Sequence, residues 1–365
     1  MLRENRVRTK ESQPTTIDLF AGVGGLSDGF ISAGFQVLAA VEVDPGLSAC
    51  YRTAHQRRGQ HPVIKTIDVR TLDPYALMTE VGLEPGELTA LVGGSPCQGF
   101  SAIGKRRGDD HRNDLIFEFP RFLRAFESEA FLIENVPGLV EGPRSDLLHD
   151  LLDELHRAGY PNATYQIVDA ASAGVPQRRL RVVISGTRNG REPDFSELRP
   201  AQAMTPTVWD AIRDLPDPQA AAEKYDLGSR IPYAARAPSS YAASMRSAGR
   251  LVSHWEPVAH QASTVLAYDR LEPGETDEAT KCYRLRPDRP SRTLRAGSRT
   301  RTACRPVHPY QPRVVTVREA ARLHSFRDAY PLPSTKSGAH VAIGNSVPPL
   351  LAKQLGKTLL QAVEL

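Results

Sequence analysis

A chain of 365 residues is long enough for one large domain with a smaller one, or for two domains of moderate size. Its hydrophobic content of 40% and charged content of 24% are those of an ordinary soluble globular protein. The net charge of +4 excludes a protein that is basic throughout, and no run of about 18 apolar residues predicts a transmembrane helix.

The start of the chain and its cysteines indicate the cellular compartment in which the protein works. Residues 1–14 are expected to form a flexible basic tail, because they lack the apolar core of a signal peptide. Cys50, Cys97, Cys282 and Cys304 are scattered, without a Cys-x-x-Cys pair or metal-ligand spacing. We therefore expect a cytoplasmic protein in a reducing environment, with no metal.

Between residues 15 and 190, short apolar runs alternate with amphipathic stretches. Strands are predicted at 16–20, 37–41, 63–67, 88–92, 131–133, 165–168 and 180–186. Helices are predicted at 26–32, 45–54, 115–126 and 146–158. This alternation predicts an α/β fold, with a mostly parallel sheet covered by helices on both faces.

After Gly190 the periodicity fades, and thirteen prolines fall between Arg191 and Pro309. This part is expected to be a second, smaller and irregular domain. Within residues 281–305, nine Lys or Arg residues face one acid, so the segment carries +8 and the rest of the chain about −4. The segment is either a solvated surface or a nucleic-acid contact, and its Ser, Thr and Gly residues favour phosphate contact.

Helical spacing returns at 317–326, and Pro348 opens a last amphipathic helix. That helix needs an apolar surface to cover. Because the first domain offers the larger one, we expect the C-terminus to fold back onto the N-terminal sheet.

Residues 93–101, Gly-Gly-Ser-Pro-Cys-Gln-Gly-Phe-Ser, place Cys97 on a stiff loop directly after a predicted buried strand. A structural cysteine would more naturally lie within the apolar run. A cysteine at a strand's end is instead positioned to attack a substrate as its thiolate, which makes this loop a candidate active site.

Three further signals lie at strand ends. Residues 18–26, Asp-Leu-Phe-Ala-Gly-Val-Gly-Gly-Leu, let the backbone approach a ligand at a helix N-terminus. Glu42 and Asp68 follow the second and third strands, where a carboxylate can bind ribose hydroxyls and an adenine amino group. Each acid alone is more often a helix cap, but the ordered set favours an adenosyl ligand.

Two charged motifs complete the pattern. Glu134 ends another core strand and could hold a proton to donate, or could simply be a capping or ion-pairing acid. Arg179 and Arg181 are two residues apart, so they are expected on one face, able to bind a carboxylate, a base or a phosphate. Arginines that alternate on an exposed surface without binding a ligand are an equally good explanation of this spacing.

Taken in order, these motifs resemble those of the DNA (cytosine-5) methyltransferases. The resemblance rests on residues 18–26, 42, 68, 93–101, 134–136, 177–181, 289–294 and 344–349. It covers about residues 15–190 and 312–365. It implies a Rossmann-like catalytic domain in these two segments and a target-recognition domain at 191–311.

The resemblance also implies a role for each matching residue. Cys97 would attack carbon 6 of a flipped cytosine, Glu134 would protonate nitrogen 3, and Arg179 would support that carboxylate with Arg181 nearby. The implied S-adenosylmethionine contacts are Phe20, Ala21, Gly22, Gly24, Gly25, Glu42, Val43, Asp68, Val69, Pro96, Leu115, Asn345 and Ser346. The implied DNA contacts are Gln98, Ser101, Arg292, Arg295 and Arg299.

Two positions depart from the family pattern. Val43 stands where a large aromatic residue often packs on adenine, so stacking is expected to be weaker or to come from Phe20. Arg292 stands where proline is frequent, which leaves the local turn open.

The resemblance favours a monomeric enzyme that methylates a specific sequence in double-stranded DNA, releases S-adenosylhomocysteine and belongs to a bacterial restriction–modification system with a cognate endonuclease. A tRNA cytosine methyltransferase is one alternative, although the roughly 120-residue variable region argues against it. A non-catalytic DNA-binding regulator is another. Such a protein would be expected to have lost Cys97 or Glu134, and this chain keeps both.

Overall fold

The structure is a computed structural model and describes residues 13–96, 114–141, 145–198, 204–295 and 305–364. Its internal contacts divide the chain into two compact units. The first unit comprises residues 1–168, 180–198 and 352–365, and the second comprises 169–179 and 199–351. Residues 169–179 and 312–351, which we assigned by sequence to the catalytic domain, thus pack within the second unit. Which activity each unit carries stays a prediction.

The first unit is built on a seven-stranded sheet. Its strands are β1 (Thr15–Leu19), β2 (Gln36–Val41), β3 (Val63–Lys65), β4 (Ala90–Gly94), β5 (Ala130–Asn135), β6 (Thr164–Asp169) and β7 (Leu180–Thr187). The strand order is β3-β2-β1-β4-β5-β7-β6. The pairs from β3 to β5 are parallel, and β7 runs antiparallel to β5. The predicted mostly parallel sheet is confirmed.

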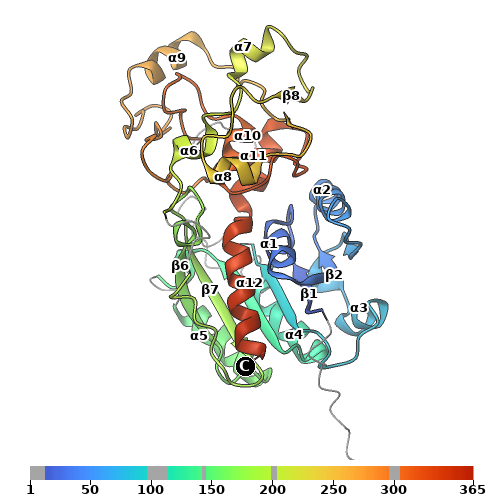
Figure 1. Cartoon of the computed structure of the whole chain (residues 1–365). Helices are drawn as coiled ribbons and strands as arrows, with labels where there is room; N and C mark the ends of the chain where they lie inside the picture. Colours follow the sequence, from blue (N-terminus) through green and yellow to red (C-terminus); the bar gives the residue numbers. More distant parts are fainter. Residues whose placement is uncertain (1–12, 97–113, 142–144, 199–203, 296–304, 365) are drawn as a thin grey trace, which may run out of the picture. The chain divides into compact units, whose positions relative to one another are not determined.

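Helices connect these strands and can be followed by their labels in Figure 1. The α-helices are α1 (Gly25–Ala33), α2 (Pro45–Gln56), α3 (Pro74–Glu80), α4 (Glu118–Phe126) and α5 (Ser145–Arg157). Single 3-10 turns are η1 (Val69–Thr71), η2 (Asp114–Phe117), η3 (Pro137–Leu139) and η5 (Ala170–Ala173). Helix α3 was not expected from the sequence, although Asp73 caps it and Pro74 occupies its first turn.

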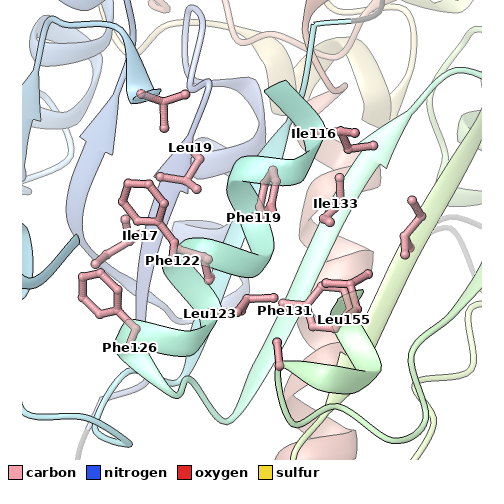
Figure 2. Close-up of a cluster of buried hydrophobic side chains, with 14 of the residues drawn as sticks. Ile17, Leu19, Ile116, Phe119, Phe122, Leu123, Phe126, Phe131, Ile133 and Leu155 are labelled. Atoms are coloured by element: carbon pink, nitrogen blue, oxygen red, sulfur yellow. The ribbon is translucent and has the colours of Figure 1, made fainter. Parts of the chain in front are cut away.

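The apolar core lies between the sheet and the helices α3, α4 and α5. Figure 2 shows Phe119 and Phe122 of α4 beside Ile17 and Leu19 of β1. These side chains are fully buried, and burial of each contributes roughly 1.5–3 kcal/mol relative to exposure. The core therefore fixes β1 and β4, whose ends carry the candidate site.

The last helix, α12 (Pro349–Glu364), returns to the first unit from residue 352 onward. Gly356 lies against α1 so closely that a Cβ there would be 3.0 Å from Cβ of Ala33. Asn189 donates a hydrogen bond to the carbonyl of Ala362. The expected return of the C-terminus to the N-terminal sheet is confirmed.

The sheet order creates a switch point. The chain leaves β1 toward β2 and β3 on one side, and β4 then pairs with the other side of β1. Ligands of open α/β sheets bind outside the carboxyl ends of the strands at such a point. Here those ends lead into the glycine loop after Leu19 and the Ser-Pro-Cys loop after Gly94.

The second unit has short elements, as its proline content predicts. They are α6 (Val208–Ile212), α7 (Pro218–Ala222), β8 (Ile231–Pro232), α8 (Ser240–Met245), β9 (Leu251–Val252), α9 (Ala262–Asp269), α10 (Val317–Leu323) and α11 (Lys336–Asn345). Its core contains a buried ion network in which Arg322 contacts Asp328 at 2.6 Å and Asp214 at 3.2 Å. Over the described ranges, none of the helices has the length and apolar character needed to cross a membrane.

Candidate active site

The loop after β1 is held in a conformation that few residue types adopt. Phe20, Gly22 and Gly24 have positive φ angles of 59°, 56° and 95°. Gly24 caps α1 without a side-chain hydrogen bond among the described residues. The loop thus brings backbone amides to the N-terminus of a helix, an arrangement that attracts electronegative ligand groups. Ala21 and Gly25 are buried beside it.

Glu42 fixes this loop. One carboxylate oxygen accepts a 2.8 Å hydrogen bond from the amide of Gly22, and the other accepts one of 2.8 Å from the amide of Asp44. Burial raises the pKa of Glu42, while these amide hydrogen bonds oppose the rise. The glutamate predicted to bind a ribose therefore also joins the end of β2 to the glycine loop.

Asp68 has the capping role that we gave as its alternative. Its carboxylate accepts a 3.0 Å hydrogen bond from the amide of Arg70 and forms a 2.6 Å ion pair with the Arg70 guanidinium. These hydrogen bonds from Arg70 lower the pKa of Asp68. The carboxylate lies at the carboxyl end of β3, where an adenine contact was expected, but a ligand must share it with Arg70.

The side chains near these acids differ in exposure. Val43 is 66% exposed and Ile67 is 38% exposed, whereas Val69 is only 4% exposed. Leu115 is partly buried and packs on the apolar core. Exposed apolar side chains at the ends of β2 and β3 provide a surface on which a flat, apolar ring can lie.

The strand before the cysteine loop requires glycine. A Cβ on Gly93 would lie 2.1 Å from the carbonyl oxygen of Leu19, so β1 and β4 approach closely there. Ser95 accepts a 2.9 Å hydrogen bond from the Asn135 side chain, and Pro96 is half-buried. Cys97 and the predicted DNA contacts Gln98 and Ser101 lie outside the described residues.

Glu134 lies next to the start of that loop. It pairs with Gly94 in the parallel register of β4 and β5, and a Cβ on Gly94 would be 3.2 Å from its carboxylate. Arg181 of β7 places Nε 2.6 Å from Oε1 of Glu134, and both side chains are less than a tenth exposed. The contact is an ion pair, because this Nε–H makes no hydrogen bond to a described residue. The structure therefore places Arg181 on the carboxylate, where the resemblance placed Arg179.

Arg179 precedes β7 and belongs to the second unit. Its guanidinium is buried and donates to the carbonyl oxygens of Leu294, Gly344 and Ser346, at 3.1, 2.7 and 3.1 Å. Asn345 ends α11 and is exposed, and Ser346 is half-buried. The expectation that Arg179 and Arg181 share one strand face is wrong, because the strand begins only at Leu180.

The basic segment is described in part. Arg292 and Arg295 are exposed, and the Arg292 guanidinium lies 3.8 Å from the ring centre of Tyr283. This cation–π contact gives Arg292 a packing role at the position where the family often has proline. Arg299 lies outside the described residues.

A buried polar chain beneath the glycine loop was not predicted as a unit. Asp18 accepts a 2.5 Å hydrogen bond from the Ser27 hydroxyl, which lies 2.6 Å from the hydroxyl of Tyr51. Burial, with a smaller contribution from the charge of Glu42, raises the pKa of Asp18 to about 7 against the hydrogen bond from Ser27. An aspartate inside an apolar strand was the signal available in the sequence.

No group of His, Cys, Asp and Glu within the described ranges has the arrangement needed to hold a metal ion. The arrangement at the switch point is therefore one of carboxylates, an arginine and backbone amides, next to a loop that carries a cysteine.

Comparison with known proteins supports a single family. Residues 14–361 match the C-5 cytosine-specific DNA methylase family. The chain belongs to this family.

Curated relatives of this DNA methylase cover nearly its whole length. Type II methyltransferase M.XorII of Xanthomonas oryzae is 35% identical over 96% of the chain and 86% of the relative. Type II methyltransferase M.AgeI of Thalassovita gelatinovora is 31% identical over 95% of the chain and 99% of the relative. A solved structure of an E. coli prophage protein described as a DNA modification methyltransferase is 27% identical, with a TM-score of 0.79 over 96% and 100% of the two chains.

Proposed function

We propose that this DNA methylase transfers a methyl group from S-adenosylmethionine to carbon 5 of a flipped cytosine within a specific double-stranded sequence. We infer that it is the modification enzyme of a Type II restriction–modification system, since its curated relatives are named Type II methyltransferases. The observation that carries the proposal is Glu134, buried against Arg181 and in register with Gly94, three residues before Cys97.

The chemistry needs these residue types. Carbon 5 of cytosine is a weak nucleophile, and addition of the Cys97 thiolate to carbon 6 makes it enamine-like. Glu134 holds and supplies the proton at nitrogen 3, so that negative charge does not accumulate on the ring. Arg181 keeps the carboxyl group in place. After transfer, loss of the carbon 5 proton expels the thiolate and restores the aromatic ring.

The first unit fits an adenosyl cofactor, which supplies an electrophilic methyl group when it is bound. The left-handed glycine loop, Glu42 and the exposed apolar side chains of Val43 and Ile67 lie at the carboxyl ends of β1 to β3. We assign Phe20, Val69, Pro96 and Leu115 to the same site, and the resemblance adds Asn345 and Ser346 as cofactor contacts. S-adenosylhomocysteine is the expected product.

Double-stranded DNA is the proposed substrate, and residues 191–311 are proposed to recognise its sequence. Taking cytosine out of the stack costs a few kcal/mol, which contacts to the opened duplex must offset. We assign that task to Gln98 and Ser101 and to the basic segment with Arg292, Arg295 and Arg299. We further propose a monomer in the cytoplasm, acting on the same site as a cognate endonuclease.

Bisulfite sequencing tests the proposal. DNA from a host that expresses the chain should show one short sequence context in which cytosine is almost fully protected from conversion. A host that expresses Cys97→Ala at the same level should show none. Absence of protected cytosine with the wild-type protein present would refute the proposal.

A tritium-methyl assay distinguishes between DNA and tRNA as the substrate. The protein should label duplex DNA and leave bulk tRNA unlabelled. Preferential labelling of tRNA would replace DNA as the substrate while keeping the chemistry at Cys97.

A further inference from the structure

Three buried polar side chains in the second unit join three separate chain segments. Gln177, Arg179 and His324 are each at most 1% exposed. Together they connect a first segment (residues 291–295, through Leu294), a second segment (residues 323–324) and a third segment (residues 344–346). We call these three side chains the hub.

Gln177 ties the first two segments. Its Oε1 accepts a 3.0 Å hydrogen bond from the amide of Leu294, so its Nε2 must be the donor group. That nitrogen donates to the carbonyl of Leu323 at 3.2 Å and faces Nδ1 of His324 at 3.0 Å. The backbone adds support, since Arg178 donates to the carbonyl of Ser291 at 2.8 Å.

His324 extends the hub to the third segment. Because Nδ1 accepts from Gln177, the proton of the neutral ring lies on Nε2. Nε2 is 2.9 Å from the carbonyl oxygen of Ser346 and therefore donates to it. The ring thus accepts a hydrogen bond from Gln177 and donates one to Ser346, which joins Gln177 to the third segment.

Arg179 bridges the first and third segments directly. One terminal nitrogen donates to the carbonyl of Leu294, and the other donates to the carbonyls of Gly344 and Ser346. A guanidinium is planar and rigid, so it fixes the distance between its partners. A shift of either segment must move the other or break these bonds.

The two bridged segments carry different proposed ligands. Arg292 and Arg295, which are exposed on the first segment, are the proposed phosphate contacts. Asn345 and Ser346, on the third, are the proposed cofactor contacts. Thr293 adds a bond from the first segment to the chain beside the hub by donating to the carbonyl of Arg178 at 2.9 Å.

We propose that Arg179, with Gln177 and His324, couples cofactor binding at residues 345–346 to DNA binding at residues 292–295, so that each ligand strengthens the other. Arg179 is then a positioning residue, which acts through backbone carbonyls rather than on the cytosine. This inference rests on the proposed function, because it assigns the two ligands to the two segments.

Linkage makes the coupling measurable. If S-adenosylhomocysteine tightens DNA binding by some factor, DNA must tighten S-adenosylhomocysteine binding by the same factor. Typical coupling between two sites is about 5- to 150-fold. When one ligand orders its segment, the hub also orders the other segment. The second ligand then binds at a lower conformational cost, so the coupling factor is greater than 1.

The experiment measures the Kd of a duplex carrying the mapped target site, with and without saturating S-adenosylhomocysteine, and the reciprocal pair. Wild type should show a coupling factor of at least about 5-fold. Arg179→Lys keeps the charge but loses the planar fork, and its factor should fall to near 1. Gln177→Glu keeps the acceptor for Leu294 and loses the donor group, so its factor should also fall.

Arg318→Lys is the matched control, because Arg318 lies outside the segment 281–305 that is assigned to phosphate. Arg318 is 1% exposed and donates to the carbonyls of Ser253 and Arg327, also within the second unit. It contacts neither bridged segment through these bonds. Its substitution should lower stability to a degree similar to Arg179→Lys and leave the coupling factor at the wild-type value.

The outcomes separate the two claims. A wild-type protein that binds neither S-adenosylhomocysteine nor DNA refutes the proposed function and the coupling with it. Wild type that binds both ligands with a factor of 1 refutes the coupling alone. The coupling is also refuted if Arg179→Lys and Gln177→Glu fold, bind both ligands and keep the full factor, or if Arg318→Lys loses it equally.

Discussion

Glu134 and Arg181 form an ion pair from which water is almost excluded, since their side chains are 7% and 9% exposed. Removing two charges from water is costly, and their mutual attraction offsets that cost only while both remain. The pair is therefore a device for holding a reactive carboxyl in one place more than a source of stability.

Arg181→Ala should destabilise the protein by about 3–5 kcal/mol, because it leaves the Glu134 charge buried and unpaired. Urea unfolding measures the loss. Arg157→Ala is the control, since Arg157 pairs with Glu154 from a side chain that is 66% exposed, and it should change little. Equal effects of the two substitutions would contradict the burial argument.

Asp18 predicts an unusual pH dependence. Its pKa is about 7 in the folded protein and 3.8 when unperturbed, so between these values the folded state binds the extra proton. Stability therefore falls as pH rises through this window and levels off above it. Asp18→Asn stays neutral throughout.

The stability of Asp18→Asn relative to wild type should rise by about 2–3 kcal/mol between pH 5 and pH 8. Paired urea titrations at these two pH values measure the difference, and other titrating groups cancel in the comparison. A difference that does not change with pH would show that Asp18 is ionised in the folded protein at both values.

For single residues, the sequence predicted which positions belong to the candidate site better than it predicted the contacts that they make. The residue types at positions 42, 68, 134 and 181 were singled out, and the structure places all four at carboxyl ends of strands or in the adjoining sheet. Arg179 was misplaced because alternation applies only within a strand, and β7 begins at Leu180, as the sequence predicted. The sequence left open whether Asp68 caps the turn that contains Arg70, and only the geometry showed that it does.

Among the elements, β1 and β4 are the pair on which the candidate site depends. Their separation at the switch point requires that residue 93 have no side chain, since a Cβ there would lie 2.1 Å from the carbonyl of Leu19 and 2.8 Å from the Phe119 ring. Backbone cannot move aside as a flexible side chain can.

Gly93→Ala should therefore cost about 3 kcal/mol or more and lower cofactor affinity, because it separates β1 from β4. Thermal unfolding and S-adenosylhomocysteine titration measure the two effects. Gly249→Ala is the control, since a Cβ there meets nothing within 4 Å. A Gly93→Ala protein with wild-type stability would contradict the close approach of the two strands.

The seven predicted strands all occur, because short apolar runs bounded by Gly, Pro and Asp are strong local signals. The helices α3 and α11 were missed, as were the short helices α6, α7, α8 and α9. Helix α3 has only seven residues, and α11 contains small and polar residues with little apolar periodicity, so tertiary packing rather than pattern stabilises them. The predicted strand at 63–67 shortens to Val63–Lys65, since Asp68 and Arg70 begin a turn.

Across the whole molecule, positive charge is concentrated in the segment that is proposed to bind DNA. The segment 281–305 carries +8, while the remainder carries about −4. Phosphate contacts release counterions, so their loss changes the salt dependence of DNA affinity.

Arg295→Ala should weaken DNA binding and reduce the slope of log K against log salt by about 0.9 if it removes one phosphate contact. S-adenosylhomocysteine affinity in the absence of DNA should not change. Arg157→Ala, from an exposed arginine of α5, should alter neither quantity. A wild-type salt slope in Arg295→Ala would contradict the assignment of this segment to phosphate.

The two compact units divide the chain at other positions than the predicted domain bounds. Thirteen prolines marked the irregular region, yet residues 169–179 and 312–351 pack with it rather than with the sheet. Those segments hold buried polar side chains such as Gln177 and Arg322, each of which has a partner over 100 residues away, beyond the reach of local pattern.

The central claim is that the sulfur of Cys97 bonds to cytosine while Glu134 supplies a proton, and covalent trapping tests it most directly. Duplex DNA with 5-fluorocytosine at the mapped site has no carbon 5 proton to lose, so with S-adenosylmethionine the enzyme should remain bound through denaturing electrophoresis. Cys97→Ala should form no such band, and Glu134→Gln should form it about 10²- to 10⁴-fold more slowly. A band of undiminished intensity from Cys97→Ala, or none from the wild-type protein that methylates the unmodified duplex, would contradict the account.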